Sequence, residues 1–356
     1  EEFMRQNMTL ENCLKKHDYV CLLKKLLTDE GLNYGNMPKG LIKFHRYSYG
    51  TRTASQEHMV EGAFYAKTKG KVSIHFTVSP EYVKMFKDHF AKTKSAFEKK
   101  YEVKYYIGIS EQKSSTDTIA VDMNNEPLRD KNGDLIFRPG GHGALIYNLN
   151  TISADLIFIK NIDNVVPDFF KKDTVRYKKV LAGKTLELQS QIFDFIKQLK
   201  KSKKVTEKLL KEIVRFFKAE LLIKFPESFE EMEKEEKVKF LINKLNRPLR
   251  VCGMVRNEGE PGGGPYLIKE KDGSITPQIV EGSQFDPDNP EQKSIINEST
   301  HFNPVDLVCA VKDYRGRKFD LTKFIDPSTG FISIKSKDGV ELKAQELPGL
   351  WNGAMA

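Results

Sequence analysis

A glycine-rich segment, residues 137–145, has the residue types of a ligand-binding turn. Gly140, Gly141 and Gly143 fall within four positions, and Arg138 and His142 stand beside them as hydrogen-bond donors. Because glycine has no Cβ, the backbone of such a turn can approach a flat or charged ligand closely. Tight structural turns are also rich in glycine, so that interpretation stays open. We expect these five residues to contact a ligand.

An acidic residue follows an apolar segment shortly after this turn. Residues 155–160 are short and apolar enough for a strand that is buried on both faces, and Asp163 comes soon after it. Open α/β sheets bind ligands at the carboxyl ends of their strands. A carboxylate there can share a Mg²⁺ ion with substrate phosphates. The alternative is that Asp163 caps a following helix.

Two further polar residues occupy positions suited to a nucleotide. Lys39 lies between Pro38 and Gly40, where a stiff loop can offer a fixed ammonium group to phosphate oxygens. A GxxxxGK[ST] phosphate loop is absent from the sequence. Gln112 follows a predicted strand, and its amide can both donate to and accept from a base edge. A surface lysine and a polar loop are the simpler interpretations.

A second group of residues could line a sugar site. A glycine-rich loop at residues 258–266 precedes Glu281, which ends a strand-like segment. His301 and Asn303 follow as candidate donors to hydroxyl or phosphate groups. Each of them could equally be structural.

The elements that must position these residues alternate between strands and helices. Residues 72–78 and 103–109 have strand character and enclose a helix that extends to about residue 100, which is the spacing of a βαβ unit. Residues 9–30 also have helical spacing. Residues 169–246 are rich in Lys and Glu and have helical periodicity, with one apolar stripe formed by Leu209, Ile213, Phe216, Phe217 and Leu221. Short strands and turns follow. We predict an α/β fold with a mixed, mostly parallel sheet flanked by helices, and a helical insertion.

Composition limits the function classes. The 356 residues are 39% apolar and carry a net charge of +9, so a large core and phosphorylated small-molecule ligands are both compatible with the sequence. The Lys-rich stretch at residues 197–218 favours a solvated helical face, and no nucleic-acid-binding motif occurs. No apolar run reaches the ~18 residues of a membrane span. The four cysteines form no CxxC pair, and Cys252 and Cys309 are expected to be buried free thiols in a reducing cytoplasm.

The order of these motifs resembles the UDP-sugar pyrophosphorylase group of nucleotide-diphospho-sugar transferases. That group has a Pro-Lys-Gly segment, a strand ending near Gln, a Pro-Gly-His-Gly-type loop, an apolar strand ending in Asn-x-Asp-Asn, and a later Val-Glu strand end. The sequence has the same order, at residues 38–40, Gln112, 139–143, 161–164 and 280–281. It more closely resembles an uncharacterised bacterial family, DUF4301, in the runs STDTIAVD, FRPGGHGALI and LKAQELPGLWNGAM.

The resemblance implies a Rossmann-like fold and a role for each candidate residue. Residues 1–168 would form the nucleotide-binding core, 169–246 the helical insertion, and 247–356 the sugar-side part that completes the sheet. Lys39 and Asp163 would be catalytic, with Asp163 also binding Mg²⁺. The nucleotide would contact Gln112, Arg138, Gly140, Gly141, His142 and Gly143, and the sugar would contact Glu281, His301 and Asn303.

The implied activity is nucleotidyl transfer from a nucleoside triphosphate, expected to be UTP, to a sugar 1-phosphate, with release of pyrophosphate. The family's glycine-rich triphosphate loop does not precede Lys39 in this sequence, and its late lysine has no aligned counterpart, Lys337 and Lys343 being the nearest. A catalytically inactive nucleotide-sugar-binding protein is therefore an alternative. A glycosyltransferase of the same fold is another, although Asn161 stands where its DxD motif would begin. The sequence identifies neither the sugar nor the oligomeric state.

Overall fold

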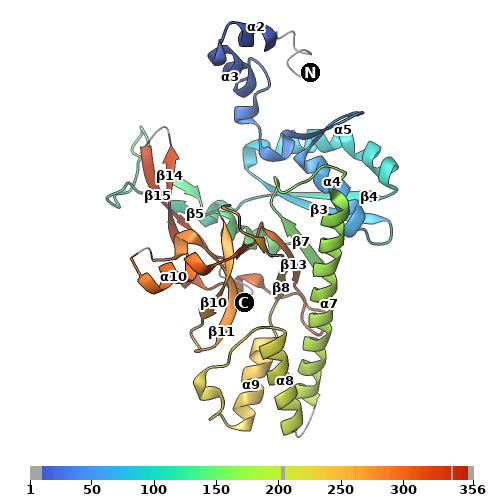
Figure 1. Cartoon of the computed structure of the whole chain (residues 1–356), viewed down its shortest axis with the longest axis vertical. Helices are drawn as coiled ribbons and strands as arrows, with labels where there is room; N and C mark the ends of the chain where they lie inside the picture. The colour runs from blue at the N-terminus through green and yellow to red at the C-terminus, as the bar shows by residue number, and fades with distance from the viewer. Residues whose placement is uncertain (1–9, 202–204, 261, 287, 338–339, 352–356) are drawn as a thin grey trace. The chain divides into compact units, whose positions relative to one another are not determined.

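The chain forms two compact units. Figure 1 shows the computed structural model, which describes residues 10–201, 205–260, 262–286, 288–337 and 340–351. Unit 1 comprises residues 1–108 and 162–175, and unit 2 comprises residues 109–161 and 176–356. The chain therefore leaves unit 1 after residue 108 and returns to it for residues 162–175. The predicted functional division at residues 168 and 246 stays a prediction.

Unit 1 combines helices with two pairs of strands. The hairpin β1–β2 is antiparallel and leads directly into α4, whose first turn is closed by a capping box between Thr53 and Gln56. Strands β3 and β4 pair with each other, and β4 continues into unit 2. The elements are α2 (Leu10–Lys15), α3 (Tyr19–Leu27), β1 (Lys43–Tyr47), β2 (Gly50–Thr53), α4 (Ala54–Tyr65), β3 (Lys71–Val78), α5 (Val83–Tyr101) and β4 (Lys104–Glu111). The strand–helix–strand order predicted for residues 72–109 is confirmed.

The single helix predicted for residues 9–30 is wrong. The structure has two helices there, α2 and α3, separated at His17, whose φ of 52° does not belong to a right-handed helix. Asp18 then starts the second helix by accepting a hydrogen bond from the backbone N of Cys21 at 2.9 Å. The apolar periodicity continues through both helices, and it does not reveal the break.

Unit 2 contains a three-stranded sheet in which β13 is the central strand. Leu307 of β13 lies opposite Ile159 of β7 on one side and opposite Cys252 of β8 on the other. The strands are β5 (Asp117–Ile119), β6 (Phe137–Pro139), β7 (Leu156–Lys160), β8 (Leu249–Cys252), β9 (Val255–Arg256), β10 (Gly263–Lys269), β11 (Ile275–Glu281), β12 (His301–Phe302), β13 (Asp306–Ala310), β14 (Phe331–Lys337) and β15 (Val340–Glu346). The short helices α6 (Ile146–Leu149) and α10 (Pro290–Glu298) accompany them.

The fold is mixed α/β, as predicted, but the expectation of mostly parallel strands differs from the structure. Both pairs of the β7–β13–β8 sheet are antiparallel, and so are the β5–β6, β10–β11, β12–β9 and β14–β15 pairs. The expectation that β7 is buried on both faces is also wrong, because β7 is an edge strand of the three-stranded sheet and its five residues are only partly buried. The sequence of β7 does not determine the direction of its partner.

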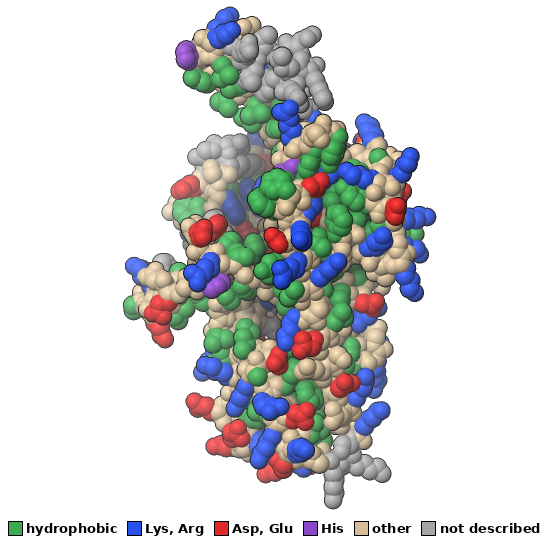
Figure 2. All heavy atoms as spheres, turned by 45° about the vertical axis from the view of Figure 1, so that its right-hand side comes forward, with side chains coloured by type: hydrophobic (Ala, Val, Ile, Leu, Met, Phe, Trp, Pro, Cys, Tyr) green, Lys and Arg blue, Asp and Glu red, His purple; other side chains and the backbone are tan. Residues whose placement is uncertain are grey.

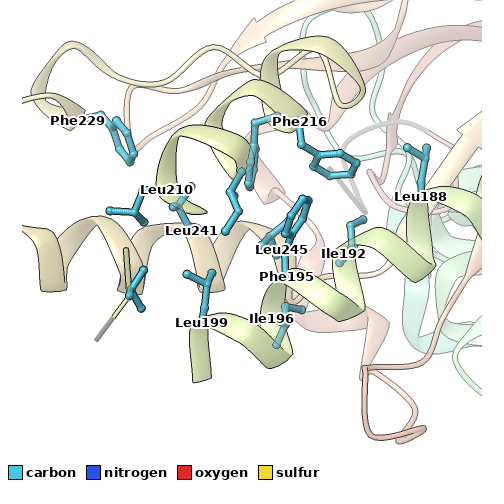
Figure 3. Close-up of a cluster of buried hydrophobic side chains, with 13 residues drawn as sticks. Leu188, Ile192, Phe195, Ile196, Leu199, Leu210, Phe216, Phe229, Leu241 and Leu245 are labelled. Carbon is cyan, nitrogen blue, oxygen red and sulfur yellow. The ribbon is translucent and has the colours of Figure 1, made fainter. Parts of the chain in front are cut away.

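Three helices form a lobe of unit 2 with its own apolar core. They are α7 (Lys171–Lys201), which begins in unit 1, α8 (Glu207–Ala219) and α9 (Lys234–Leu245). Figure 3 shows their inward side chains, among them Ile196, Phe216 and Leu241. The predicted stripe is confirmed, because Ile213, Phe216 and Phe217 are buried while Leu209 and Leu221 pack against them. The core of this lobe consists of apolar side chains from the three helices and from the segments beside them.

The Lys-rich stretch forms a solvated face. The described lysines between residues 197 and 218 are exposed, and Figure 2 shows basic and acidic side chains interspersed over the lower part of the view, where these helices lie. Cys309 is buried, Cys252 is partly buried, and both are free thiols. Within the described parts of the chain, no helix combines the length and apolar character that a membrane crossing requires.

Candidate functional site

Lys39 and Asp163 form an ion pair in unit 1, although 124 residues separate them in the sequence. Lys39 Nζ lies 2.7 Å from Asp163 Oδ2, and the two side chains are 67% and 38% exposed. The hydrogen bond from Lys39 outweighs the opposing effect of partial burial and lowers the pKa of Asp163. A ligand in solvent can therefore reach an ammonium group and a carboxylate held side by side.

The local sequence explains why these two residues meet. Lys39 begins a 3₁₀ turn after Pro38, and a Cβ on the next residue, Gly40, would lie 2.6 Å from the Phe86 ring and 3.3 Å from Ile162 Cγ1. The glycine thus lets the backbone beside Lys39 pack directly onto the residue that precedes Asp163. Asp163 does not cap a helix, because α7 begins only at Lys171. The helix-cap alternative is therefore wrong.

Asp163 is the one acidic candidate for a metal ion that the sequence singled out. The described residues contain no group of three His, Cys, Asp or Glu side chains that could hold a metal ion. A Mg²⁺ ion needs fewer protein ligands, because it usually binds one or two carboxylates and takes its other oxygens from phosphates and water. The carboxylate of Asp163 fits an ion that arrives with a phosphorylated ligand, and it does not fit a permanently bound one. Binding by Asp163 stays a prediction.

The glycine-rich turn lies in unit 2 against the end of the described chain. The backbone N of Leu347 donates to Gly140 O at 2.8 Å, and that of Leu350 donates to Gly143 O at 3.1 Å. A Cβ at Gly143 would lie 1.8 Å from Leu347 O, and one at Gly141, whose φ is +78°, would lie 1.6 Å from a carboxylate oxygen of Glu346. The close approach that these glycines permit is therefore made, in this structure, by residues 346–350.

His142 joins this turn to two other candidate residues. Its Nε2 lies 3.1 Å from Glu281 Oε1, and both atoms are buried without a hydrogen bond of good geometry among the described residues. The imidazole also lies against the Trp351 ring, with centroids 5.1 Å apart. Trp351 Nε1 in turn donates to Asn303 Oδ1 at 2.8 Å. We call His142, Glu281, Asn303 and Trp351 the histidine–tryptophan cluster.

The other predicted site residues of unit 2 lie on neighbouring elements. Gln112 follows β4, and its side-chain Nε2 is buried with no hydrogen-bond partner in the described structure. Arg138 lies on β6 opposite Thr118. His301 lies on β12, where its Nδ1 is 2.8 Å from Thr300 Oγ1. Their roles stay predictions.

Two features of the sites were not recognised in the sequence. Trp351, the single tryptophan, is 5% exposed and connects His142 with Asn303. In unit 1, a set of buried charged side chains around Glu57 lies on β2, on α4 and on the segment that follows Asp163. The sequence of α4 held one indication of it: the helix carries Glu57 and Glu61 among small and apolar residues, but no Lys or Arg.

Two crystal structures are among those that are similar to this chain. One is a mutant UDP-glucose pyrophosphorylase from Leishmania major in complex with UDP-glucose, at 13% identity and a TM-score of 0.41, covering 89% of this chain and 55% of that one. The other is described as a putative UDP-N-acetylglucosamine pyrophosphorylase from Entamoeba histolytica, at 12% identity and a TM-score of 0.41, covering 87% of this chain and 64% of that one. This chain thus spans somewhat more than half of either structure. Comparison with curated proteins gave no match.

The family model DUF4301, described as a domain of unknown function, matches residues 1–356. The resemblance inferred from the runs in residues 115–122, 137–146 and 342–355 is therefore confirmed, and the chain belongs to the DUF4301 family.

Proposed function

We propose that this protein is a nucleotidyltransferase that forms a nucleotide-sugar from a sugar 1-phosphate and a nucleoside triphosphate, with UTP as the expected donor. The contact between Lys39 and Asp163 carries the proposal. Both residues were singled out from the sequence as groups that act on phosphates, and the fold brings them to 2.7 Å. The proposal includes a fold of the nucleotide-diphospho-sugar transferase type with a Rossmann-like core.

The reaction requires charge neutralisation more than proton transfer. An oxygen of the sugar 1-phosphate attacks the α-phosphorus of the triphosphate, the bond from that phosphorus to the bridging oxygen breaks, and pyrophosphate leaves. The nucleophile is already an anion, so no general base is needed. Two polyanions must approach each other, and an ammonium group such as that of Lys39 lowers the electrostatic barrier.

Asp163 has a complementary role in this proposal. Its carboxylate would hold a Mg²⁺ ion that enters with the triphosphate and neutralises phosphate charge. Lys39 would then exchange its contact with Asp163 for one with a phosphate oxygen. The low pKa of Asp163 keeps its carboxylate ionised at neutral pH, the form that binds a cation.

For unit 2 taken by itself, the proposal concerns recognition of the nucleotide and of the sugar. Gln112, Arg138, Gly140, Gly141, His142 and Gly143 are proposed to contact the base and ribose, and Glu281, His301 and Asn303 the sugar. The buried side-chain nitrogen of Gln112, which has no hydrogen-bond partner among the described residues, supports this, because buried polar atoms usually have a partner.

A second candidate function is nucleotide-sugar binding without turnover. One observation favours it: Glu346 and Leu347 occupy the space next to Gly141 and Gly143 that a ligand would need. A protein in which this packing persists would bind less of the nucleotide than an active transferase does.

Release of pyrophosphate tests the proposal directly. The protein is incubated with Mg²⁺, UTP and a panel of sugar 1-phosphates, and thermal shift with UTP and UDP-sugars is measured in parallel. We expect Lys39→Met and Asp163→Asn to lower kcat by about 10²-fold or more, as the loss of one charge-stabilising group does in other enzymes.

The matched control is Lys94→Met, because Lys94 forms a similar partly exposed ion pair with Glu98, at 3.7 Å, in the same unit. Its turnover should equal that of the wild type. Binding of UDP-sugars without pyrophosphate release would replace the proposal by the binding function. Absence of both binding and release across the panel would overturn both.

A further inference from the structure

A fully buried carboxylate in unit 1 collects four donors. Glu57 of α4 accepts hydrogen bonds from Tyr47 Oη at 2.6 Å and Arg52 Nη1 at 3.2 Å, and lies 3.0 Å from His45 Nδ1. Lys171 Nζ lies 2.8 Å from its second oxygen. Burial alone would raise the pKa of Glu57, but the contacts with Lys171 and Tyr47 lower it, so the carboxylate is charged.

Arg52 connects Glu57 with a second carboxylate. Its guanidinium donates to both oxygens of Asp168, at 2.6 and 2.8 Å, across 116 residues of sequence. The side chain of Arg52 is only 4% exposed, and its guanidinium lies 4.2 Å from the centre of the Tyr47 ring. A bidentate pair of this kind fixes the relative orientation of the two groups as well as their separation.

These contacts join the segment 162–171 to α4 and the preceding hairpin at three points. Near its start, the carbonyl of Ile162 lies 3.0 Å from His58 Nε2. Towards its end, Asp168 is held by Arg52, and Lys171 is held by Glu57 and by Val166 O. Asp163, whose carboxylate meets Lys39, lies between these points.

Stability alone is a weak reason for such a cluster. Removing charged groups from water costs several kcal/mol each, and apolar side chains of similar size are often as stabilising or more so. What a cluster of oriented ion pairs provides in addition is a defined geometry. Here the two long-range pairs have opposite polarity: an anion of the segment meets Arg52, while a cation of the segment meets Glu57.

We infer that Arg52, Glu57, Asp168 and Lys171 are positioning residues, which hold the segment 162–171 so that the Asp163 carboxylate faces Lys39. The predicted change in turnover rests on the proposed function, whereas the predicted change in the order of residues 162–171 rests on the structure alone.

Asp168→Asn is the most informative variant. Asn has nearly the same shape as Asp, so the change removes one charge, and because the Asp168 side chain is 42% exposed we expect the variant to fold. Amide hydrogen exchange should become faster in peptides covering residues 162–170 and stay unchanged in peptides of α5. In the pyrophosphate-release assay, kcat should fall by about 10–100-fold, the range seen when an outer partner of a metal-binding group is lost, while KM for the sugar phosphate stays constant. Asp168→Glu should restore part of kcat.

Glu30→Gln is the matched control, since it makes the same change from carboxylate to amide in the exposed Lys25–Glu30 pair of unit 1. It should alter neither measurement. Unchanged exchange at residues 162–170 in Asp168→Asn would overturn the inference, and so would exchange that quickens equally throughout unit 1. If the wild type transfers no nucleotide but exchange quickens only at residues 162–170, the proposed function fails while the positioning of the segment is supported.

Discussion

Two helices of this protein bury different kinds of side chain. Helix α8 buries an apolar stripe that contains Ile213 and Phe217, and its polar residues face solvent. Helix α4 is buried on most of its surface, and two of its fully buried residues are Glu57 and Glu61. The difference shows that helices in this molecule are buried in two ways. In α8 apolar side chains are removed from water, whereas α4 also buries carboxylates, and that of Glu57 is paired with cationic side chains.

The two kinds of burial predict that the helices differ in their tolerance to side-chain substitution. An apolar core depends mainly on volume, so a small change of shape costs little. A buried ion pair depends on both partners, because removal of one leaves the other charged and unsolvated. Substitutions that preserve shape should therefore be mild in α8 and severe in α4.

Glu57→Gln should have the largest effect. The substitution preserves shape but removes the charge that Arg52 and Lys171 face, and the loss of one partner of a buried pair costs about 3–5 kcal/mol. Hydrogen exchange of α4 amides, converted into an opening free energy, measures this locally. A loss below about 1 kcal/mol, the range of exposed pairs, would show that the charges around Glu57 are solvated and would remove the contrast with α8.

The same contrast explains which elements could be read from the sequence. The helix at residues 207–219 was recognisable because Ile213, Phe216 and Phe217 recur with helical spacing and lead to one apolar face. The strand β3 was recognisable from its alternation. The direction in which β7 pairs was not, because it depends on β13, about 150 residues away, and no local pattern encodes it.

The candidate site was predictable to a similar extent. The types and order of residues singled out Lys39 and Asp163, and the fold brings them into contact. Glu57 and Arg52 were missed, because charged residues are expected at the surface and part of the pairing that accompanies their burial comes from the distant residues Asp168 and Lys171. Trp351 was missed because a single aromatic residue carries no period, and its contacts with His142 and Asn303 come from distant segments.

Acidification should destabilise α4 more than α8, and the difference should be smaller than the effect of Glu57→Gln. The pKa values of Glu57 and Asp168 are both lowered in the folded protein: burial opposes the shift, and hydrogen bonds from Lys171 and Arg52 respectively outweigh it. A carboxyl group with a lowered pKa stabilises the fold at pH values above its unfolded pKa, and that stabilisation is lost as the pH falls through the folded value. The loss should therefore occur below about pH 4.

Exchange protection, corrected for the intrinsic pH dependence of exchange, provides the measurement. Protection in α4 should fall at a higher pH than protection in α8, whose buried face contains no carboxylate. In the Asp168→Asn variant one of these groups no longer titrates, so the acid-induced loss in α4 should be smaller. Equal pH dependence of both helices would indicate that acid acts on the whole chain and not on the charges around Glu57.

Ile213→Val should have the smallest effect and completes the comparison. Ile213 is 0% exposed and lies among Phe216, Phe217 and Leu241 in the helical core. The substitution removes one methylene group from a packed site, which costs about 0.5–1.5 kcal/mol. The opening free energy of α8 amides should fall by this amount, and exchange in α4 should not change. A loss as large as that expected for Glu57→Gln would mean that the helical core is as intolerant of the loss of one methylene group as the charged cluster is of the loss of one charge. The two modes of burial would then differ in chemistry but not in tolerance, and the buried charges of α4 would need no role beyond stability.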